Sequence, residues 1–424
     1  MTEQVNLANM NVAFEFSNCL GSENLKNFKQ KWVHNMKTIS ASATVTINAL
    51  AKEKRLKGEK VYNFAAGDPV LMNHHCIINK AIGHIEKGCC PYPPVEGIPE
   101  LRSLVAAWMN ASYQTQFSKD NVLVTCGGKF ALFAIIYSIL ESNEEVLIPA
   151  PYWVSYPDIV QMAGGKPKIV PTCSDNGWKL TPHDIVRHAT KNSKMLIFNN
   201  ACNPTGVLYT KQEISDILTV AKNYNLVVIS DEVYSGLTYD EPGFISCGSF
   251  SEHTERVIIV QSCSKNFGMT GWRTGFVLGP ENVIKKLAIL QSQSTTGVSI
   301  ASQWAAVGAL ENAEKVNFYV KEAMRRRRDL FVENYNSLFS TQLAEIKSGL
   351  YAFVSLDSMG ISHTTDSIDV CEQLIASDNI ALVPGTAFGV DGYVRFAFSE
   401  SEEDIHEALH VLKQSINRLV GALL

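Results

Sequence analysis

Two residues of this 424-residue chain are well suited to catalysis, a lysine among small residues and an aspartate behind an apolar run. Lys265 lies in the stretch Ser262-Cys-Ser-Lys-Asn-Phe-Gly268, which follows the mostly apolar run 256–260. A lysine at such a strand end can be held partly desolvated, which lowers its pKa and makes its amine nucleophilic. Asp231 follows the apolar run 226–229, and a buried acid there requires a cation or a protonated group as its partner.

Three further features could bind anions. Gly127-Gly128-Lys129 opens a predicted helix, whose N-terminal N–H groups favour a negative charge, although a glycine pair can also simply turn the chain. Arg273 lies eight residues after Lys265 and could hold a phosphate. Arg395 lies in an otherwise apolar strand, and a buried guanidinium there requires a carboxylate partner.

Two other loops are less specific on their own. Trp153 could stack on a planar ring, although a tryptophan in such a loop more often only packs. The sequence Asn203-Pro-Thr-Gly206 is by itself more often a plain turn than a binding site. Both loops follow predicted strands, as Lys265 and Asp231 do, and this shared position makes both loops candidates for the same site.

The chemistry-bearing loops follow a series of short apolar strands. These runs do not alternate, which is typical of strands buried on both faces of a mostly parallel sheet. Helical stretches such as 211–224 separate some of them, so we expect an α/β fold whose sheet is sandwiched by helices. Sites in such sheets lie at the carboxyl ends of the strands. The predicted strands are 122–125, 145–148, 168–170, 195–198, 226–229 and 256–260.

A smaller α+β domain is expected after the sheet. Residues 311–337 predict a long charged helix, 351–355 and 393–398 predict alternating strands, and the chain ends in a predicted helix. We expect a helix over 42–57 and a short strand from Tyr62 to complete this domain. The predicted organisation is an N-terminal extension (1–30), the N-terminal part of the small domain (31–70), a large cofactor-binding domain (71–310) and the C-terminal part of the small domain (311–424).

Composition and charge disfavour several classes of protein. The net charge of −5 and the pI of about 6.1 disfavour nucleic-acid binding, and the run Arg325–Arg328 is interpreted as a solvated helix face. The ten cysteines show no metal-ligand spacing, so we expect reduced thiols and no metal site. No basic segment followed by an apolar stretch opens the chain, and the longest apolar run, 130–140, is too short for a membrane span. We therefore expect a cytoplasmic protein.

One cofactor would account for these residues together. Pyridoxal 5′-phosphate requires a lysine for its Schiff base, an acid for its pyridinium nitrogen and an anion cradle for its phosphate. A separate arginine would receive the α-carboxylate of an amino acid. Lys265, Asp231, Arg273 and Arg395 meet these requirements.

From about Ser42 to its C-terminus the chain resembles the class I and II aminotransferases, which are pyridoxal-phosphate-dependent enzymes of fold type I. The stretch 262–275 carries the resemblance most specifically, together with its order relative to Asn203-Pro-Thr-Gly, Asp231-Glu-Val-Tyr234 and Arg395. Within that family the chain is most similar to the bacterial aspartate aminotransferases. The segments that indicate this subgroup are Tyr92–Arg102, Pro151–Pro157 and Leu290–Thr295.

The resemblance implies a role for each candidate residue. Lys265 would be the Schiff-base lysine and the proton shuttle, and Asp231 would keep the ring nitrogen protonated. Tyr234 would complete the catalytic set and, with Asn203, would bond the 3′ oxygen of the ring. The residues implied to bind the cofactor are Tyr92, Gly127, Gly128, Lys129, Trp153, Asn203, Asp231, Tyr234, Ser262, Lys265 and Arg273. Those implied to bind the substrate are Ser42, Thr44, Gly67, Lys129, Trp153, Asn203 and Arg395.

The implied reaction is a ping-pong transfer of an amino group from L-aspartate to 2-oxoglutarate. Tyr92 matches a tyrosine that reaches the phosphate from the partner subunit, so the resemblance also implies a homodimer. Three points stay open: whether Lys129 serves the substrate or only the cofactor phosphate, whether prephenate or aromatic substrates are accepted, and what the N-terminal extension does. A fold-type I lyase or synthase and a non-catalytic regulator are less favoured alternatives. The sequence departs from the family pattern at Asn199-Asn-Ala-Cys202, where a proline is often found.

Overall fold

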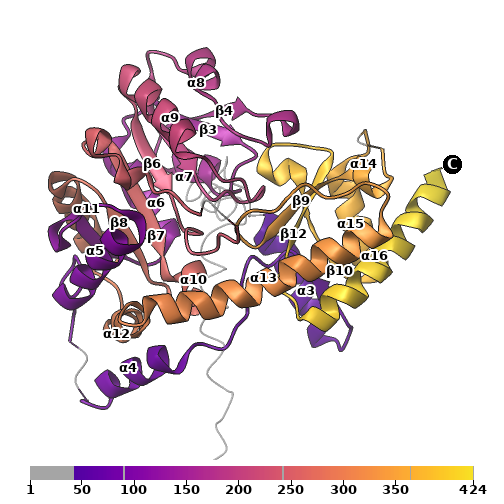
Figure 1. Cartoon of the computed structure of the whole chain (residues 1–424), viewed down its shortest axis with the longest axis horizontal. Coiled ribbons are helices and arrows are strands. Elements are labelled where there is room, and N and C mark those ends of the chain that lie inside the picture. The colour runs from indigo at the N-terminus through magenta and orange to yellow at the C-terminus, as the bar shows by residue number, and fades with distance from the viewer. Residues whose placement is uncertain (1–42, 89–90, 241–242, 363, 424) are drawn as a thin grey trace, which may run out of the picture. The chain divides into compact units, whose positions relative to one another are not determined.

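A seven-stranded sheet forms the centre of the computed structural model, which describes residues 43–88, 91–240, 243–362 and 364–423 (Figure 1). Six of its strands run in one direction, and only β8 runs antiparallel to its neighbours β2 and β7. The mostly parallel sheet expected from the sequence is therefore confirmed. In spatial order the strands are β2 (Val122–Thr125), β8 (Gly275–Leu278), β7 (Val257–Ser262), β6 (Val227–Asp231), β5 (Ser193–Asn199), β3 (Glu145–Ala150) and β4 (Lys166–Pro171).

Helices cover both faces of this sheet, so successive residues of a strand enter different cores. In β7, for example, Ile259 belongs to one apolar cluster and Ile258 to the other. This double burial explains why the inner strands are mostly apolar and do not alternate. On the side of Ile259 lie α4 (His75–Ile85), α5 (Pro99–Tyr113), α8 (Pro182–His188), α9 (Lys211–Asn223) and α12 (Ile300–Leu310). On the side of Ile258 lie α6 (Gly128–Ile139), α7 (Tyr156–Met162) and α11 (Glu281–Ser294).

Strand β8 was not among the predicted strands. It is four residues long, begins with a glycine and pairs antiparallel with both neighbours, so it offers little pattern of its own. Its first residue, Gly275, lies against the backbone of Gly127, where a side-chain Cβ would clash. A glycine is therefore required where β8 approaches the turn that leads from β2 into α6.

A second, smaller sheet lies in the C-terminal part of the chain. Its antiparallel strands are β11 (Val383–Pro384), β12 (Tyr393–Ala397) and β9 (Tyr351–Ser355), and a parallel pair joins β1 (Tyr62–Asn63) to β10 (Ile380–Ala381). The expectation that β12 alternates is wrong, because Val394 to Ala397 are all buried. The helices around these strands are α3 (Ala43–Leu56), α13 (Ala313–Leu338), α14 (Leu356–Met359), α15 (Ser367–Asp378) and α16 (Glu402–Leu423), and α13 packs along α16 (Figure 1).

The interpretation of Arg325–Arg328 as a solvated face holds for only half of the run. Arg325 and Arg326 are exposed. Arg327 is half-buried, and its Nη1 donates to the carbonyl of Pro69 at 2.7 Å. Arg328 is also half-buried and places its guanidinium 4.6 Å from the ring centre of Tyr239. A helix of period 3.6 turns the second pair of side chains toward the protein, where each finds specific partners.

The predicted domain boundaries at residues 70 and 310 stay a prediction, because the described residues belong to one compact unit, Ala41–Leu424. Within it, α3 and β1 pack with β10, although they are far apart in sequence. The expected N-terminal extension, residues 1–30, lies outside the described residues. In the part of the chain that the structure describes, no helix is long and apolar enough to cross a membrane.

Candidate active site

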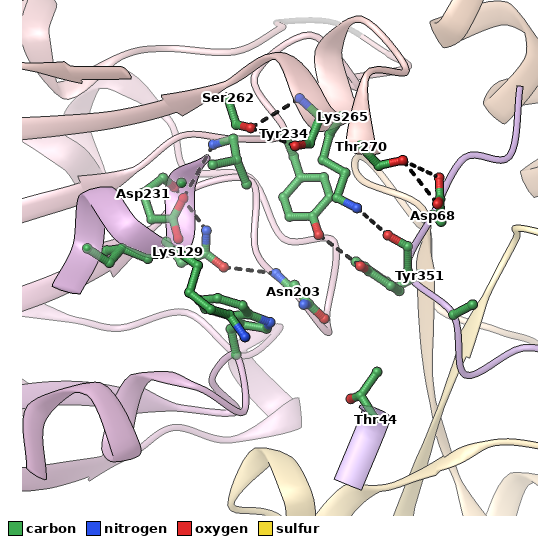
Figure 2. Close-up of a pocket in the computed structure, with 18 of the residues that line it drawn as sticks. Thr44, Asp68, Lys129, Asn203, Asp231, Tyr234, Ser262, Lys265, Thr270 and Tyr351 are labelled. Carbon is green, nitrogen blue, oxygen red and sulfur yellow. Dashed lines mark hydrogen bonds between the residues drawn. The ribbon is translucent and has the colours of Figure 1, made fainter. Parts of the chain in front are cut away.

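A cavity of about 340 Å³ lies at the carboxyl ends of the parallel strands (Figure 2). Strands β5, β6 and β7, the start of α6 and the α3 helix all contribute to its wall, and β12 of the smaller sheet supplies Arg395. Its charged lining residues are Asp68, Lys129, Asp231, Lys265, Arg273 and Arg395, and its neutral ones include Thr44, Asn48, Gly67, Gly128, Trp153, Tyr156, Asn199, Asn203, Tyr234, Ser262, Ser264, Thr270 and Tyr351. The cavity therefore lies where the sequence analysis predicted a site, at the carboxyl ends of the strands.

Asp231 is the last residue of β6 and is only 4% exposed. The Tyr156 hydroxyl donates to its Oδ2 at 2.6 Å, and the Val233 N–H donates to its Oδ1 at 3.4 Å. Burial raises the pKa of Asp231 to about 6, while the hydrogen bonds from Tyr156 and Val233 act in the opposite direction. Such a carboxyl is well suited to a cationic partner inside the cavity, because that partner would stabilise its ionised form.

Lys265 projects into the same cavity from the short helix α10 (Cys263–Asn266), which follows β7 directly. The Ser262 hydroxyl caps this helix by accepting from the Ser264 N–H at 3.1 Å. The Lys265 side chain is half-buried, and its Nζ donates to the carbonyl of Gly67 (Figure 2). The amine is thus held within the cavity by a neutral acceptor, and no described carboxylate forms an ion pair with it.

An anion cradle lies on one side of the cavity, where α6 begins. Gly127 precedes the helix with φ +80°, and a Cβ there would clash with the Arg273 guanidinium. The Ser262 hydroxyl, which also lines the cavity, donates to Ser264 Oγ at 2.9 Å. The helix N-terminus at Gly128, the guanidinium and two hydroxyls therefore converge, and this donor set suits a phosphate.

Arg395 lies on β12 and is 2% exposed. Its Nη2 donates to the Ala65 carbonyl at 2.7 Å and its Nη1 donates to Asn203 Oδ1 at 3.2 Å, while its buried Nε has no partner among the described residues. Burial lowers its pKa, against the opposing influence of the Tyr351 and Tyr234 hydroxyls. The carboxylate partner expected from the sequence is not found among the described residues, so the guanidinium is left able to bind one in the cavity.

Two tyrosines and an asparagine line the wall between Asp231 and Arg395. The hydroxyls of Tyr234 and Tyr351 lie 2.8 Å apart (Figure 2), and burial together with Tyr351 raises the pKa of Tyr234. Asn203 is 2% exposed, and its backbone N–H donates to Asn199 Oδ1 at 2.9 Å. The wall is thus polar and internally hydrogen-bonded, which fixes the orientation of its side chains.

Lys129 extends along the other side of the cavity. Its Nζ lies 4.9 Å from the ring centre of Trp153, and the edge of that ring packs on Tyr156. Although the residue as a whole is exposed, its ammonium lies against protein atoms. Burial and the charge of Arg273 lower the pKa of Lys129, and Asp158 opposes them. An ammonium with so little compensating charge nearby would gain from an anionic ligand.

The aminotransferase class I and II family matches residues 59–412 of the chain. The chain belongs to this family. A probable aspartate/prephenate aminotransferase of Aquifex aeolicus is 33% identical over 384 residues, which span 90% of this chain and 97% of the relative. The aspartate/prephenate aminotransferase of Thermus thermophilus is 34% identical and spans 90% and 98% of the two chains. The solved aspartate aminotransferase from Thermus thermophilus with maleate gives a TM-score of 0.85 at 33% identity, covering 90% of this chain and 98% of its own.

The structure of this aminotransferase brings together most of the site residues predicted from its sequence. Gly127 lies beside the lining residues, against Arg273. Tyr92 is 89% exposed and does not line the cavity of its own chain. Ser42 lies outside the described residues. The predicted residues that line the cavity are Thr44, Gly67, Gly128, Lys129, Trp153, Asn203, Asp231, Tyr234, Ser262, Lys265, Arg273 and Arg395.

Sequence reasoning assigned no role to several residues of the aminotransferase cavity, among them Tyr156, Tyr351 and Ser264. Tyr156 lies within the segment that indicated the subgroup, yet its contact with Asp231 spans 75 positions and has no sequence signal. Tyr351 begins β9, and its contact with Tyr234 spans 117 positions. Ser264 precedes Lys265 directly in the most specific motif, and this position is the sequence signal by which Ser264 could have been predicted to line the cavity.

Proposed function

We propose that this aminotransferase moves the amino group of L-aspartate to 2-oxoglutarate by a ping-pong mechanism, giving oxaloacetate and L-glutamate, with pyridoxal 5′-phosphate as its cofactor. The observation that carries the proposal is a single cavity with two separate cationic ends. Arg273 and the start of α6 form one end, and Arg395 forms the other, with Lys265 and Asp231 also lining it. The relatives named aspartate or aspartate/prephenate aminotransferase support the choice of substrate.

The cavity residues fit pyridoxal phosphate. Its phosphate would lie in the cradle of Gly127, Gly128, Ser262 and Arg273, where a helix N-terminus and a guanidinium offer donors and no carboxylate is present among the cradle residues. Its ring nitrogen would bond the Asp231 carboxylate, and the positive charge of the protonated nitrogen would offset the burial that raises the pKa of this acid. The other residues proposed to hold the ring are Trp153 on its face, Asn203 and Tyr234 at its 3′ oxygen, and Lys265, whose amine would hold the cofactor covalently.

When bound, the cofactor supplies an electron sink that stabilises negative charge at the substrate Cα. Arg395 orients the substrate by binding its α-carboxylate through the planar guanidinium. Lys265 Nζ would be the base that takes the proton from the substrate Cα, and its contact with the Gly67 carbonyl keeps the amine inside the cavity. Asp231, oriented by the Tyr156 hydroxyl, would keep the ring nitrogen of the bound cofactor protonated.

A dicarboxylic substrate needs a second cation, since Arg395 binds one carboxylate. Lys129 is our candidate, and the resemblance assigns Ser42 and Thr44 to substrate binding as well. Thr44 lines the cavity and its buried hydroxyl has no hydrogen-bond partner. The alternative role of Lys129 is to assist Arg273 at the cofactor phosphate. Prephenate or aromatic substrates are a second candidate, favoured by the aspartate/prephenate names of several relatives.

We also propose that the active form is a homodimer with each site completed across the subunit interface. Tyr92 is 89% exposed on a single chain, which suits a residue that reaches a partner's phosphate. The cytoplasmic location stays a prediction of the sequence.

The experiment that tests this function is a pair of half-reactions followed by the absorbance of the cofactor. The holoenzyme is mixed in separate experiments with aspartate, glutamate or phenylalanine. In each case 2-oxoglutarate is then added to the enzyme that has reacted with the donor. We expect aspartate and glutamate to convert the cofactor to its amine form and 2-oxoglutarate to restore the aldehyde form. A cofactor that never cycles, or that cycles only with aromatic donors, would contradict the proposal.

A further inference from the structure

The pocket-facing side of α3 carries a polar residue to which no role has yet been given. Asn48 lines the cavity together with Thr44 and Val45. Thr44 and Asn48 are four positions apart on the helix, so their side chains share one face. Asn48 is half-buried, and among the described residues its side chain is anchored at one of its two polar atoms, the carbonyl oxygen.

A chain of hydrogen bonds fixes which way the Asn48 amide is turned. The backbone N–H of Ala65 can only donate, and it donates to Asn63 Oδ1 at 3.1 Å. Asn63 must therefore offer its NH₂ group to the next residue, and its Nδ2 donates to Asn48 Oδ1 at 2.6 Å. The oxygen of Asn48 is thus committed to Asn63, and the group that Asn48 leaves available is the NH₂ donor.

The α3 side of the cavity consequently presents donors and no negative charge. Within the described part of the chain, the only hydrogen bond of the Asn48 side chain is the one to Asn63. Thr44, one turn earlier, has a buried hydroxyl without a partner. Under the proposed function, Arg273 and Lys265 are taken by the cofactor and Arg395 by the α-carboxylate, so Lys129 is the remaining cation of the lining. A neutral donor and a remaining cation in the lining of one cavity suit a carboxylate and not an apolar side chain.

We propose that Asn48 is a specificity-determining residue, whose side-chain NH₂ donates a hydrogen bond to the distal carboxylate of a dicarboxylic substrate. The inference rests on the proposed function and assigns it a further binding residue. The bond favours aspartate, glutamate and 2-oxoglutarate over aromatic substrates, because an aromatic side chain offers no acceptor to this donor.

The substitution Asn48→Asp tests this proposal sharply. It keeps an oxygen for Asn63 Nδ2 and replaces only the second polar group, turning a donor into a negatively charged acceptor. We expect the KM for aspartate and for 2-oxoglutarate to rise by about tenfold or more, since 1.4 kcal/mol corresponds to a factor of ten. The KM for phenylalanine should change by no more than about twofold. Calorimetric titration of the holoenzyme with succinate, a dicarboxylate that cannot react, should show the same loss of affinity, while 3-phenylpropionate should not.

Two further variants make the result decisive. Asn192→Asp introduces the same charge on an exposed turn and should leave every constant unchanged. Asn48→Leu removes the donor without adding charge, so it should weaken succinate binding even if Asn48→Asp does not fold.

Equal losses for all ligands in Asn48→Asp would mean that this residue only maintains the bond to Asn63, and unchanged succinate binding would mean that the amide faces away from the ligand. Either result overturns the inference and leaves the proposed function intact. A wild-type enzyme that binds no dicarboxylate would overturn both.

Discussion

The hydroxyl of Tyr156 donates a hydrogen bond of 2.6 Å to Oδ2 of Asp231. The tyrosine begins α7 and the aspartate ends β6, and both are almost fully buried. A carboxyl group so deeply buried is costly to ionise, and the free energy of that ionisation depends on the hydrogen bonds that the carboxylate accepts. The orientation and the charge of the residue proposed to bond the ring nitrogen therefore depend on a tyrosine from a different helix.

Removing that donor should weaken the ionised form of Asp231. In Tyr156→Phe the aromatic ring is retained and only the hydroxyl is lost, so packing is largely preserved. A hydrogen bond to a charged group contributes about 1.5–3 kcal/mol, so we expect kcat/KM for aspartate to fall by about 10- to 100-fold. Steady-state kinetics measure this, with Tyr137→Phe, an exposed tyrosine on α6, as the matched control. Unchanged kinetics would separate Tyr156 from catalysis.

The raised pKa of Asp231 makes a prediction about the stability of the cofactor-free protein. Burial raises this pKa from 3.8 to about 6, so the folded chain binds the proton more tightly than the unfolded chain. The stabilising effect of the neutral carboxyl is complete below pH 3.8 and is lost as the pH rises toward 6. Above that, ionisation costs about 3 kcal/mol at 1.36 kcal/mol per pKa unit.

Asp231→Asn cannot ionise and should therefore gain stability relative to the wild type as the pH rises from 4 to 8, by about 2–3 kcal/mol. Denaturant unfolding of both cofactor-free proteins across this range measures the difference. Glu232, whose pKa burial raises to about 7, is present in both proteins, so most of its contribution cancels in the difference. A stability difference that does not vary with pH would show that Asp231 is not the buried titrating group.

Arg395→Lys should impair every substrate to a similar extent. Lysine keeps the positive charge but cannot offer the planar pair of donors that binds a carboxylate. We expect the KM for aspartate, phenylalanine and 2-oxoglutarate to rise together by about tenfold or more, since the α-carboxylate is common to all. Arg326→Lys, on the exposed face of α13, serves as the control. A loss confined to dicarboxylic substrates would instead place the distal carboxylate at Arg395.

Lys129→Ala should discriminate between substrates. If the ammonium binds the distal carboxylate, the KM for aspartate should rise by about tenfold, corresponding to roughly 1.5 kcal/mol, and more than the KM for phenylalanine. The exposed Lys166→Ala on β4 controls for the loss of a surface charge. The same loss for both donors would assign Lys129 to the cofactor phosphate.

The large sheet and the edge that carries the site were predictable, because strands buried on both faces are mostly apolar and do not alternate. The run 226–229 ends just before Asp231 and the run 256–260 just before the Lys265 loop, so the parallel order places both at one edge. Strand β8 could not be found in this way, since its four residues pair only through neighbours distant in sequence.

Contacts between distant segments also limit how much of the site can be predicted from the sequence. The burial of Arg395 was expected from its apolar strand, but its actual partners, Asn203 and the Ala65 carbonyl, come from 192 and 330 positions away. Arg327 was predicted to be solvated like its three neighbours, but the structure shows its guanidinium donating to the Pro69 carbonyl. No local pattern encodes such pairings, because they depend on how the two sheets are placed by the rest of the chain.

The central claim is that Lys265 holds the cofactor, and borohydride reduction of the purified holoenzyme tests it most directly. Reduction should fix pyridoxal phosphate to the protein irreversibly, and mass spectrometry of the digest should find the label on the peptide that contains Lys265. Lys265→Ala should take up no label and lose transamination by several orders of magnitude, because the amine that holds the cofactor and moves the proton is gone. A label on another lysine, or a Lys265→Ala variant that still transaminates, would contradict the account.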